Sequence, residues 1–190
     1  MKRSTQIFAL LAIERRPAIA EESLKNAYFR KTESLRLDQA GADALSSLNM
    51  AFRIISNPAT RIQHLLKLEF GIAREARIGS DLGELFGSVV EALEKADQEF
   101  GSLSAESSAL IRALAFRTMD GVRERLVQIE DELWQRERSL LSELGQIDGI
   151  WPESPAQCRE SLARIAVDLT FVQKWLSEVR ERKIRLEELA

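Results

Sequence analysis

The chain of 190 residues offers few side chains whose type and setting could do chemistry. His64 is its only histidine and Cys158 its only cysteine. A general base or a nucleophile needs a partner that orients it or takes its proton, and the sequence near His64 suggests none. We therefore interpret His64 as a polar residue on a helix surface, with a general base as the alternative. Cys158 falls at an apolar position of a helix pattern, so we expect a small buried residue, with a reactive thiol as the alternative.

The sequence also gives no indication of a metal or cofactor site. Two runs of consecutive carboxylates are Glu130-Asp131-Glu132 and Glu187-Glu188. A hard cation needs several oxygen ligands at one site, and no other ligand type converges on these runs, so we interpret them as solvated helix faces. The sequence contains no glycine-rich phosphate loop and no nucleophile elbow. It therefore predicts a protein that is not an enzyme and that needs no cofactor.

The composition predicts an all-α protein. The chain has 45% hydrophobic and 30% charged residues, with only 9 glycines and 4 prolines, and it is rich in good helix formers. Its formal net charge of -3 gives no general attraction to nucleic acid. A single cysteine excludes an internal disulfide and suits a reducing compartment. We expect a cytoplasmic protein.

Neither a secretory signal nor a membrane span is expected. The first twenty residues imitate a signal, with a basic start, the short apolar run IFALLAI and a small-residue site. Glu14, Arg15 and Arg16 interrupt that pattern. No stretch approaches the ~20 apolar residues that cross a bilayer, so we expect no membrane partner.

The clearest element is a helix, a corner and a second helix between residues 45 and 71. Apolar residues recur at spacings of three and four up to Ile55, which places them on one helix face. Asn57-Pro58 then ends this helix and begins the next, because the residue before proline avoids the α region and proline fits the first helical position. Asn57 can cap the second helix, and Gly71 supplies its end.

The C-terminal half predicts long helices. An apolar pattern runs from Asp81 to Phe100, and a further long helix opens near Ser104. A turn rich in glycine and proline is expected from Gly145 to Pro155. The last helix shows a heptad seam that runs from Cys158 to Leu186. Two such helices joined by a short turn pack antiparallel, so the half forms a three-helix bundle, or a two-helix coiled coil with the third helix strapped on.

The run NMAFRIISNPATRIQHLL resembles the third helix and exit corner of a J-domain, N-x-A-Y-x-x-L-x-[DNH]-P-x-x-R. The matching positions are Asn49, Ala51, Phe52, Ile55, Asn57, Pro58 and Arg61. FALLAI resembles the J-domain opening, with Ala12 in place of glycine, and Ala27-Tyr28 fits the second helix. The continuation LLKLEFG looks most like the HscB family, the J-type co-chaperones of iron–sulfur cluster assembly. This resemblance implies a J-like domain over residues 1–72 and a three-helix bundle over residues 80–190.

The chain departs from the family at the tripeptide His-Pro-Asp, through which a J-domain stimulates ATP hydrolysis by its chaperone. The same register here holds Arg36-Leu37-Asp38. The basic face of the second helix is also diluted by glutamates. By resemblance, the degenerate chaperone-docking set is Lys25, Arg30, Lys31, Arg36, Leu37 and Asp38. These changes predict a J-like domain that does not stimulate the ATPase in the usual way.

In HscB proteins the first bundle helix binds the cluster scaffold protein through apolar and acidic residues. The corresponding region here contains Leu85, Phe86, Val89 and Glu91. The resemblance thus implies a non-enzymatic co-chaperone or adaptor, with a DnaK-class chaperone or a cluster scaffold protein as partner. Two alternatives stay open: an oligomeric helical scaffold, for instance a homodimer, and a working co-chaperone that still docks through Asp38 and the basic helix. The three tryptophans are expected to pack between helices, and an exposed tryptophan cluster would instead mark a partner site.

Overall fold

The computed structural model describes residues 7–37, 41–71, 79–105 and 109–189, and in these ranges its regular elements are all helices. The predicted all-α class is therefore confirmed. The chain forms two compact units. The first joins Met1–Arg77 with Leu141–Leu169, and the second joins Ile78–Leu140 with Thr170–Ala190. The predicted division into 1–72 and 80–190 assigns the whole C-terminal hairpin to one domain, whereas residues 141–169 group with the N-terminal residues.

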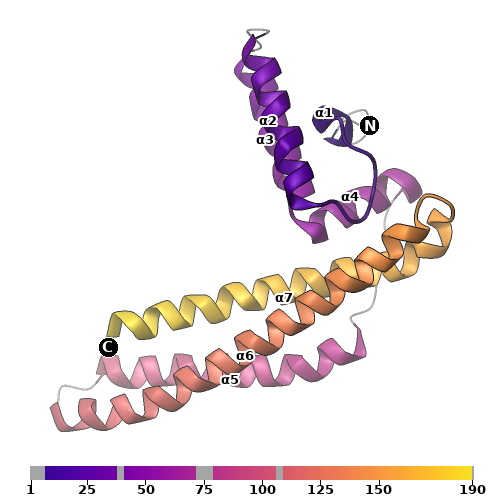
Figure 1. Ribbon diagram of the computed structural model, residues 1–190. Coiled ribbons are helices and arrows are strands. Elements are labelled where there is room, and N and C mark those ends of the chain that lie inside the picture. Colours follow the sequence, from indigo (N-terminus) through magenta and orange to yellow (C-terminus); the bar gives the residue numbers. More distant parts are fainter. Residues whose placement is uncertain (1–6, 38–40, 72–78, 106–108, 190) are drawn as a thin grey trace. The chain divides into compact units, whose positions relative to one another are not determined.

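The first unit contains a helical hairpin with a short helix across it. Helices α2 (Glu21–Leu37) and α3 (Ala42–Ser56) lie side by side and antiparallel, and α1 (Ile7–Leu11) contacts both (Figure 1). Each helix buries one apolar stripe. The buried residues are Phe8 and Leu11 from α1, Leu24 and Ala27 from α2, and Leu48, Ala51 and Ile55 from α3.

The corner after α3 has the predicted geometry. Asn57 is extended (φ -85°, ψ 121°), and its Oδ1 accepts a hydrogen bond from the Thr60 N–H at 3.1 Å. Pro58 then opens α4 (Pro58–Phe70), and Gly71, with φ 82°, ends it. At this corner the Asn57 side chain pairs with the Thr60 N–H, and Pro58 has no N–H that needs a partner.

Ala12 ends α1 in a left-handed conformation with φ 53°. Its N–H donates to the Ala9 carbonyl at 3.0 Å, and the Ile13 N–H donates to the Phe8 carbonyl at 3.1 Å. This pair of bonds is the Schellman motif, whose left-handed position usually holds glycine. Alanine carries a conformational cost in this left-handed position, because its Cβ lies close to the following carbonyl oxygen, and glycine does not.

Helix α6 (Ala109–Ile150) is longer than the sequence predicts. It passes without a break through Asp120-Gly121, and it also includes Gly145, so the predicted turn from Gly145 to Pro155 is wrong in its first half. The turn occupies residues 151–154, and α7 (Pro155–Leu189) begins directly after it. Glycine costs about 1 kcal/mol in a helix interior, and burial of Leu144 and Ile147 offsets that cost.

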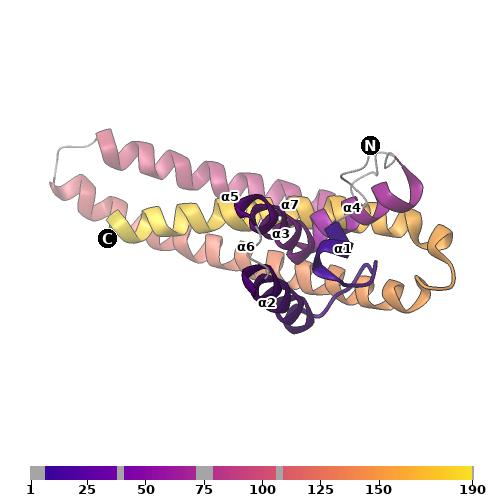
Figure 2. The ribbon, with the colours of Figure 1, turned by 90° about the horizontal axis from the view of Figure 1, so that it is seen from above.

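The second unit is a bundle of three helix segments. Helix α5 (Ser80–Ala105) lies alongside α6 and α7 in both ribbon views (Figures 1 and 2). Lys183 of α7 donates to the Glu130 carboxylate of α6, and Arg182 of α7 pairs with Asp97 of α5 at 2.8 Å. The core between them is mainly aliphatic, and Phe100 of α5 and Trp175 of α7 are also buried. Among the described residues no helix meets the length and apolarity that a bilayer crossing requires.

Candidate protein-binding surfaces

A polar network holds the loop between α1 and α2 in place within the first unit. The Asp148 carboxylate accepts hydrogen bonds from Arg16 Nη2 (2.6 Å), Arg16 Nε (3.3 Å) and the Ala18 N–H (3.0 Å). The indole N–H of Trp151 donates to the Arg15 carbonyl at 3.0 Å. This loop precedes the helix that carries the predicted chaperone-docking residues, so residues from the α6–α7 turn region help to position it.

Arg61, the last position of the J-like pattern, is buried at 4% exposure. Its Nε donates to the Pro17 carbonyl at 2.8 Å and its Nη1 to the Ile55 carbonyl at 2.9 Å. Burial lowers the pKa of Arg61 to about 10, and the charge of Asp148 opposes that shift. Arg61 therefore ties the α1–α2 loop to the end of α3.

The predicted chaperone-docking residues do not form one basic patch. Lys25 and Arg36 share an exposed stripe of α2 with Phe29, since they lie four residues before and seven residues after it. Arg30 lies on the other flank, and Lys31 borders a groove. Lys25 is already paired with Glu21, and the hydrogen bond from Lys25 lowers the pKa of that carboxylate. The face of α2 is therefore mixed in charge, as the sequence indicates.

Apolar side chains are exposed toward the end of α2. Leu37 is 79% exposed and Phe29 is 63% exposed. Arg36 is exposed beside Leu37, while Asp38 lies outside the described residues. Exposed apolar side chains next to cationic ones are the kind of surface that protein partners use. Phe29 was not among the predicted binding residues.

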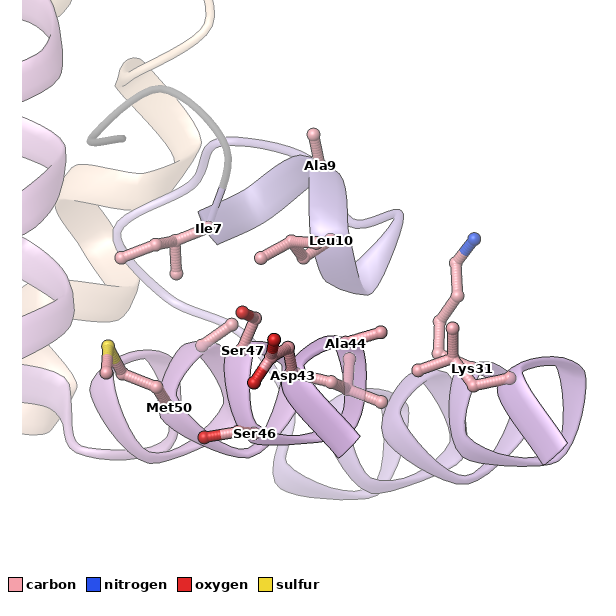
Figure 3. A pocket seen from close by; sticks show the side chains of 12 residues that line it. Ile7, Ala9, Leu10, Lys31, Asp43, Ala44, Ser46, Ser47 and Met50 are labelled. Atoms are coloured by element: carbon pink, nitrogen blue, oxygen red, sulfur yellow. The ribbon is translucent and has the colours of Figure 1, made fainter. Parts of the chain in front are cut away.

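A groove of about 810 Å³ runs between α1, α2 and α3. Figure 3 shows Ile7 and Leu10 of α1 above the first turns of α3, which contribute Ser47 and Met50. Lys31 stands on the α2 side and Asp43 on the α3 side. Sequence patterns did not indicate this groove, because it depends on how the short α1 crosses the hairpin. It adds a concave, largely apolar surface near the exposed end of α2.

The predicted surface on α5 is only partly a surface. Phe86 is 53% exposed, Glu91 is exposed and Leu85 is half-buried. Val89 is completely buried, so its assignment to a binding surface is wrong. It continues a seven-residue series with Leu82 and Ala96, and all three face the core of the bundle.

The exposed part of α5 adjoins an aromatic cluster. The Phe86 ring lies 5.8 Å from Trp175 of α7, and Phe171 lies 5.7 Å from the same tryptophan. Trp175 is buried, so Phe86 presents the outer edge of this cluster.

The remaining candidates have structural roles. His64 is half-buried and its ring stacks on Phe8 at a centroid distance of 5.9 Å. Cys158 is buried, as its position in the seam predicts, and burial raises the pKa of its thiol. Trp151 and Trp175 are buried between helices, whereas Trp134 is half-buried beneath the Arg180 guanidinium. The structure assembles no group of three metal-binding side chains from the residues it describes.

The chain was compared with protein-family models, with curated proteins and with solved structures, and none of them matched.

Proposed function

We propose that this chain is a non-enzymatic adaptor of the J-like, HscB type, which binds a protein partner without stimulating a chaperone ATPase. The observation that carries the proposal is the corner after the α2–α3 hairpin. Asn57 caps α4, Pro58 opens it, and the buried Arg61 donates to Pro17 before the hairpin and to Ile55 in the last turn of α3. These residues resemble the J-domain pattern, and the contacts that each of them makes support the proposal. Iron–sulfur cluster assembly is the process that the resemblance implies, and the cytoplasm is the compartment that the single cysteine suits.

The lost tripeptide supports binding without stimulation. In the family, the histidine and proline at this place serve the ATPase stimulation. Arg36 and Leu37 offer a long cation and an exposed apolar chain instead, and these differ from an imidazole and a rigid ring in shape and in hydrogen bonding. Together with Phe29, they still provide an apolar and cationic contact surface for a protein. The partner class is a DnaK-class chaperone or a cluster scaffold protein.

An ATPase assay with a DnaK-class chaperone tests the functional half of the proposal. We expect no stimulation by the unaltered protein and a gain of stimulation by the double variant Arg36→His, Leu37→Pro. The matched control adds Asp38→Asn to that double variant and should lose the gain. Strong stimulation by the unaltered protein would contradict the proposal. Purification of tagged protein from the native extract tests the binding half, with Leu37→Asp and Phe29→Asp as variants that should release the partner.

The alternative is an oligomeric helical scaffold. It is favoured by the length of α6 (42 residues) and α7 (35 residues), and by exposed apolar residues on the second unit, such as Val127 and Ile184. Sedimentation velocity separates the two hypotheses, because a scaffold must self-associate at micromolar concentrations. A protein that stays monomeric while it retains a chaperone partner supports the adaptor.

A further inference from the structure

One face of α6 in the second unit carries a set of side chains that lie outside the buried stripe of the helix. Val127, Asp131, Trp134 and Arg138 follow one another at spacings of four, three and four residues, so they lie on one side of the helix. The buried stripe of α6 runs through the neighbouring positions Leu126, Ile129, Leu133 and Leu140. The face is therefore turned away from the core.

The apolar part of this face is exposed. Val127 is 39% exposed, and Trp134 is half-buried with the Arg180 guanidinium 5.0 Å above its ring. Ile184 of α7 is 58% exposed and comes four residues after Arg180, so it stands one turn further along the side of α7 that reaches Trp134. A tryptophan bordered by exposed aliphatic residues is the composition of a contact centre.

Among the residues that the structure describes, the charges on this face have no counter-charge. Within the described residues, neither Asp131 nor Arg138 takes part in an ion pair. The neighbouring carboxylates differ in this respect. Glu130 pairs with Lys183 and Arg180, and Glu132 approaches Arg125 at 3.9 Å. The two exposed charges of opposite sign thus flank Trp134, with Asp131 three residues before it and Arg138 four residues after it.

This arrangement is complementary to itself. When two identical helices lie antiparallel with Trp134 at the two-fold axis, a residue three positions before it faces the residue three positions after it. Asp131 then lies opposite position 137 of the partner helix, and the partner's Arg138 is one residue further along, about 1.5 Å in the axial direction. A long arginine side chain spans this offset. The same contact forms twice, because an interface around a two-fold axis repeats each pairing.

We propose that this face of α6 is a homotypic interface, in which a second copy of the chain packs antiparallel around Trp134 and each Asp131 pairs with the partner's Arg138. The contact is a single helix face, at the low end of specific interfaces below about 1,200 Å². The dimer therefore dissociates in the micromolar range and responds to salt. The interface is independent of the J-like adaptor function, and it would give the scaffold alternative a defined contact.

Sedimentation velocity at micromolar to near-millimolar concentrations tests the interface with a charge exchange. We expect the unaltered protein to dimerise with rising concentration. Asp131→Arg and Arg138→Asp each replace two attractions by two repulsions, and each should weaken the dimer about tenfold or more. The double variant Asp131→Arg, Arg138→Asp restores opposite signs and should dimerise like the unaltered protein. All these positions are exposed, so the monomer fold is maintained, which circular dichroism verifies.

Glu188→Arg serves as the matched control, because it makes the same change in net charge at an exposed position of α7 outside the face. It should leave the dimer unchanged. A protein that remains monomeric throughout the concentration range overturns the proposal. So does a dimer that neither single reversal weakens, and so does a double variant that fails to recover what the single variants lose. Binding of an unrelated protein to this face in place of a second copy would count against it in the same way.

Discussion

Replacement of Asp148 by alanine should loosen the first unit locally. The substitution removes the acceptor for Arg16 Nη2, Arg16 Nε and the Ala18 N–H, and leaves only the bond from Arg16 to the backbone carbonyl of residue 148. It also removes a negative charge whose field favours the protonated form of the buried Arg61. Hydrogen bonds to charged groups contribute about 1.5–3 kcal/mol each, and the 37% exposure of the Arg16 side chain reduces that value. We expect a loss of about 2 kcal/mol in total.

Cys158 provides the assay, because it is the only thiol and it is buried in the same unit. A thiol reagent labels it only when the region opens, so the labelling rate under native conditions reports the local free energy of opening. A loss of 2 kcal/mol corresponds to about thirtyfold faster labelling. Asp148→Asn keeps an acceptor for the Ala18 N–H and should fall between the alanine variant and the unaltered protein.

Glu153→Ala is the matched control, since Glu153 is an exposed carboxylate in the adjacent turn. It should leave the labelling rate unchanged. If Asp148→Ala also labels within about twofold of the unaltered protein, the network does not hold the loop, and the stated reasoning fails.

Three further predictions concern stability. Ala12→Gly should stabilise the protein by about 0.5–1 kcal/mol, because the strain relieved at a left-handed alanine exceeds the added entropic cost of glycine. The urea midpoint should therefore rise. An unchanged or lower midpoint would show that Ala12 is not strained. The hydrogen bond from Lys183 keeps the pKa of Glu130 in the folded protein below its ordinary value of 4.5. The pair therefore contributes its full stabilisation above pH 4.5, and this contribution is lost as the pH falls through the lowered pKa of the folded state. Glu130→Gln should cost about 1–2 kcal/mol at neutral pH and flatten this acid dependence in urea titrations. Val89→Ala should lower the free energy of unfolding by about 2 kcal/mol, because Val89 is completely buried. Phe86→Ala should lower it by about 1 kcal/mol or less, because Phe86 is largely exposed. Equal losses would contradict the assignment of Val89 to the core and Phe86 to the surface.

Local signals in the sequence predict the helices and their corner well. Asn57-Pro58 predicts both the end of α3 and the start of α4, since capping and proline geometry involve only a few neighbouring residues. The extension of α6 past Gly145 has no such signal. A glycine in a helix is unfavourable by itself, and the burial of Ile147 and Trp151 that compensates for it comes from tertiary contacts.

The contact between Asp148 and Arg16 also could not be predicted from local sequence signals. The two residues lie 132 positions apart, and neither belongs to a pattern that anticipates the other. On α5 the information was present but ambiguous. Apolar residues occupy more than one side of this helix, so spacing alone does not tell that Val89 faces the core and Phe86 its edge. The groove beside α1 likewise depends on a crossing that no local pattern specifies.

Because the first unit is discontinuous in sequence, it cannot fold completely early in synthesis on the ribosome. Its N-terminal part ends at residue 77, but the unit is complete only when residue 169 has been made. At roughly 5–20 residues per second, the ribosome adds the missing segment ~5–20 s later. During that interval the emerging helices α1 to α4 lack Asp148 and Trp151, and the apolar surface that residues 141–169 cover is exposed. Chaperones should therefore bind nascent chains that are stalled before residue 141. Chains released after residue 169 can complete the first unit and should not be bound in this way.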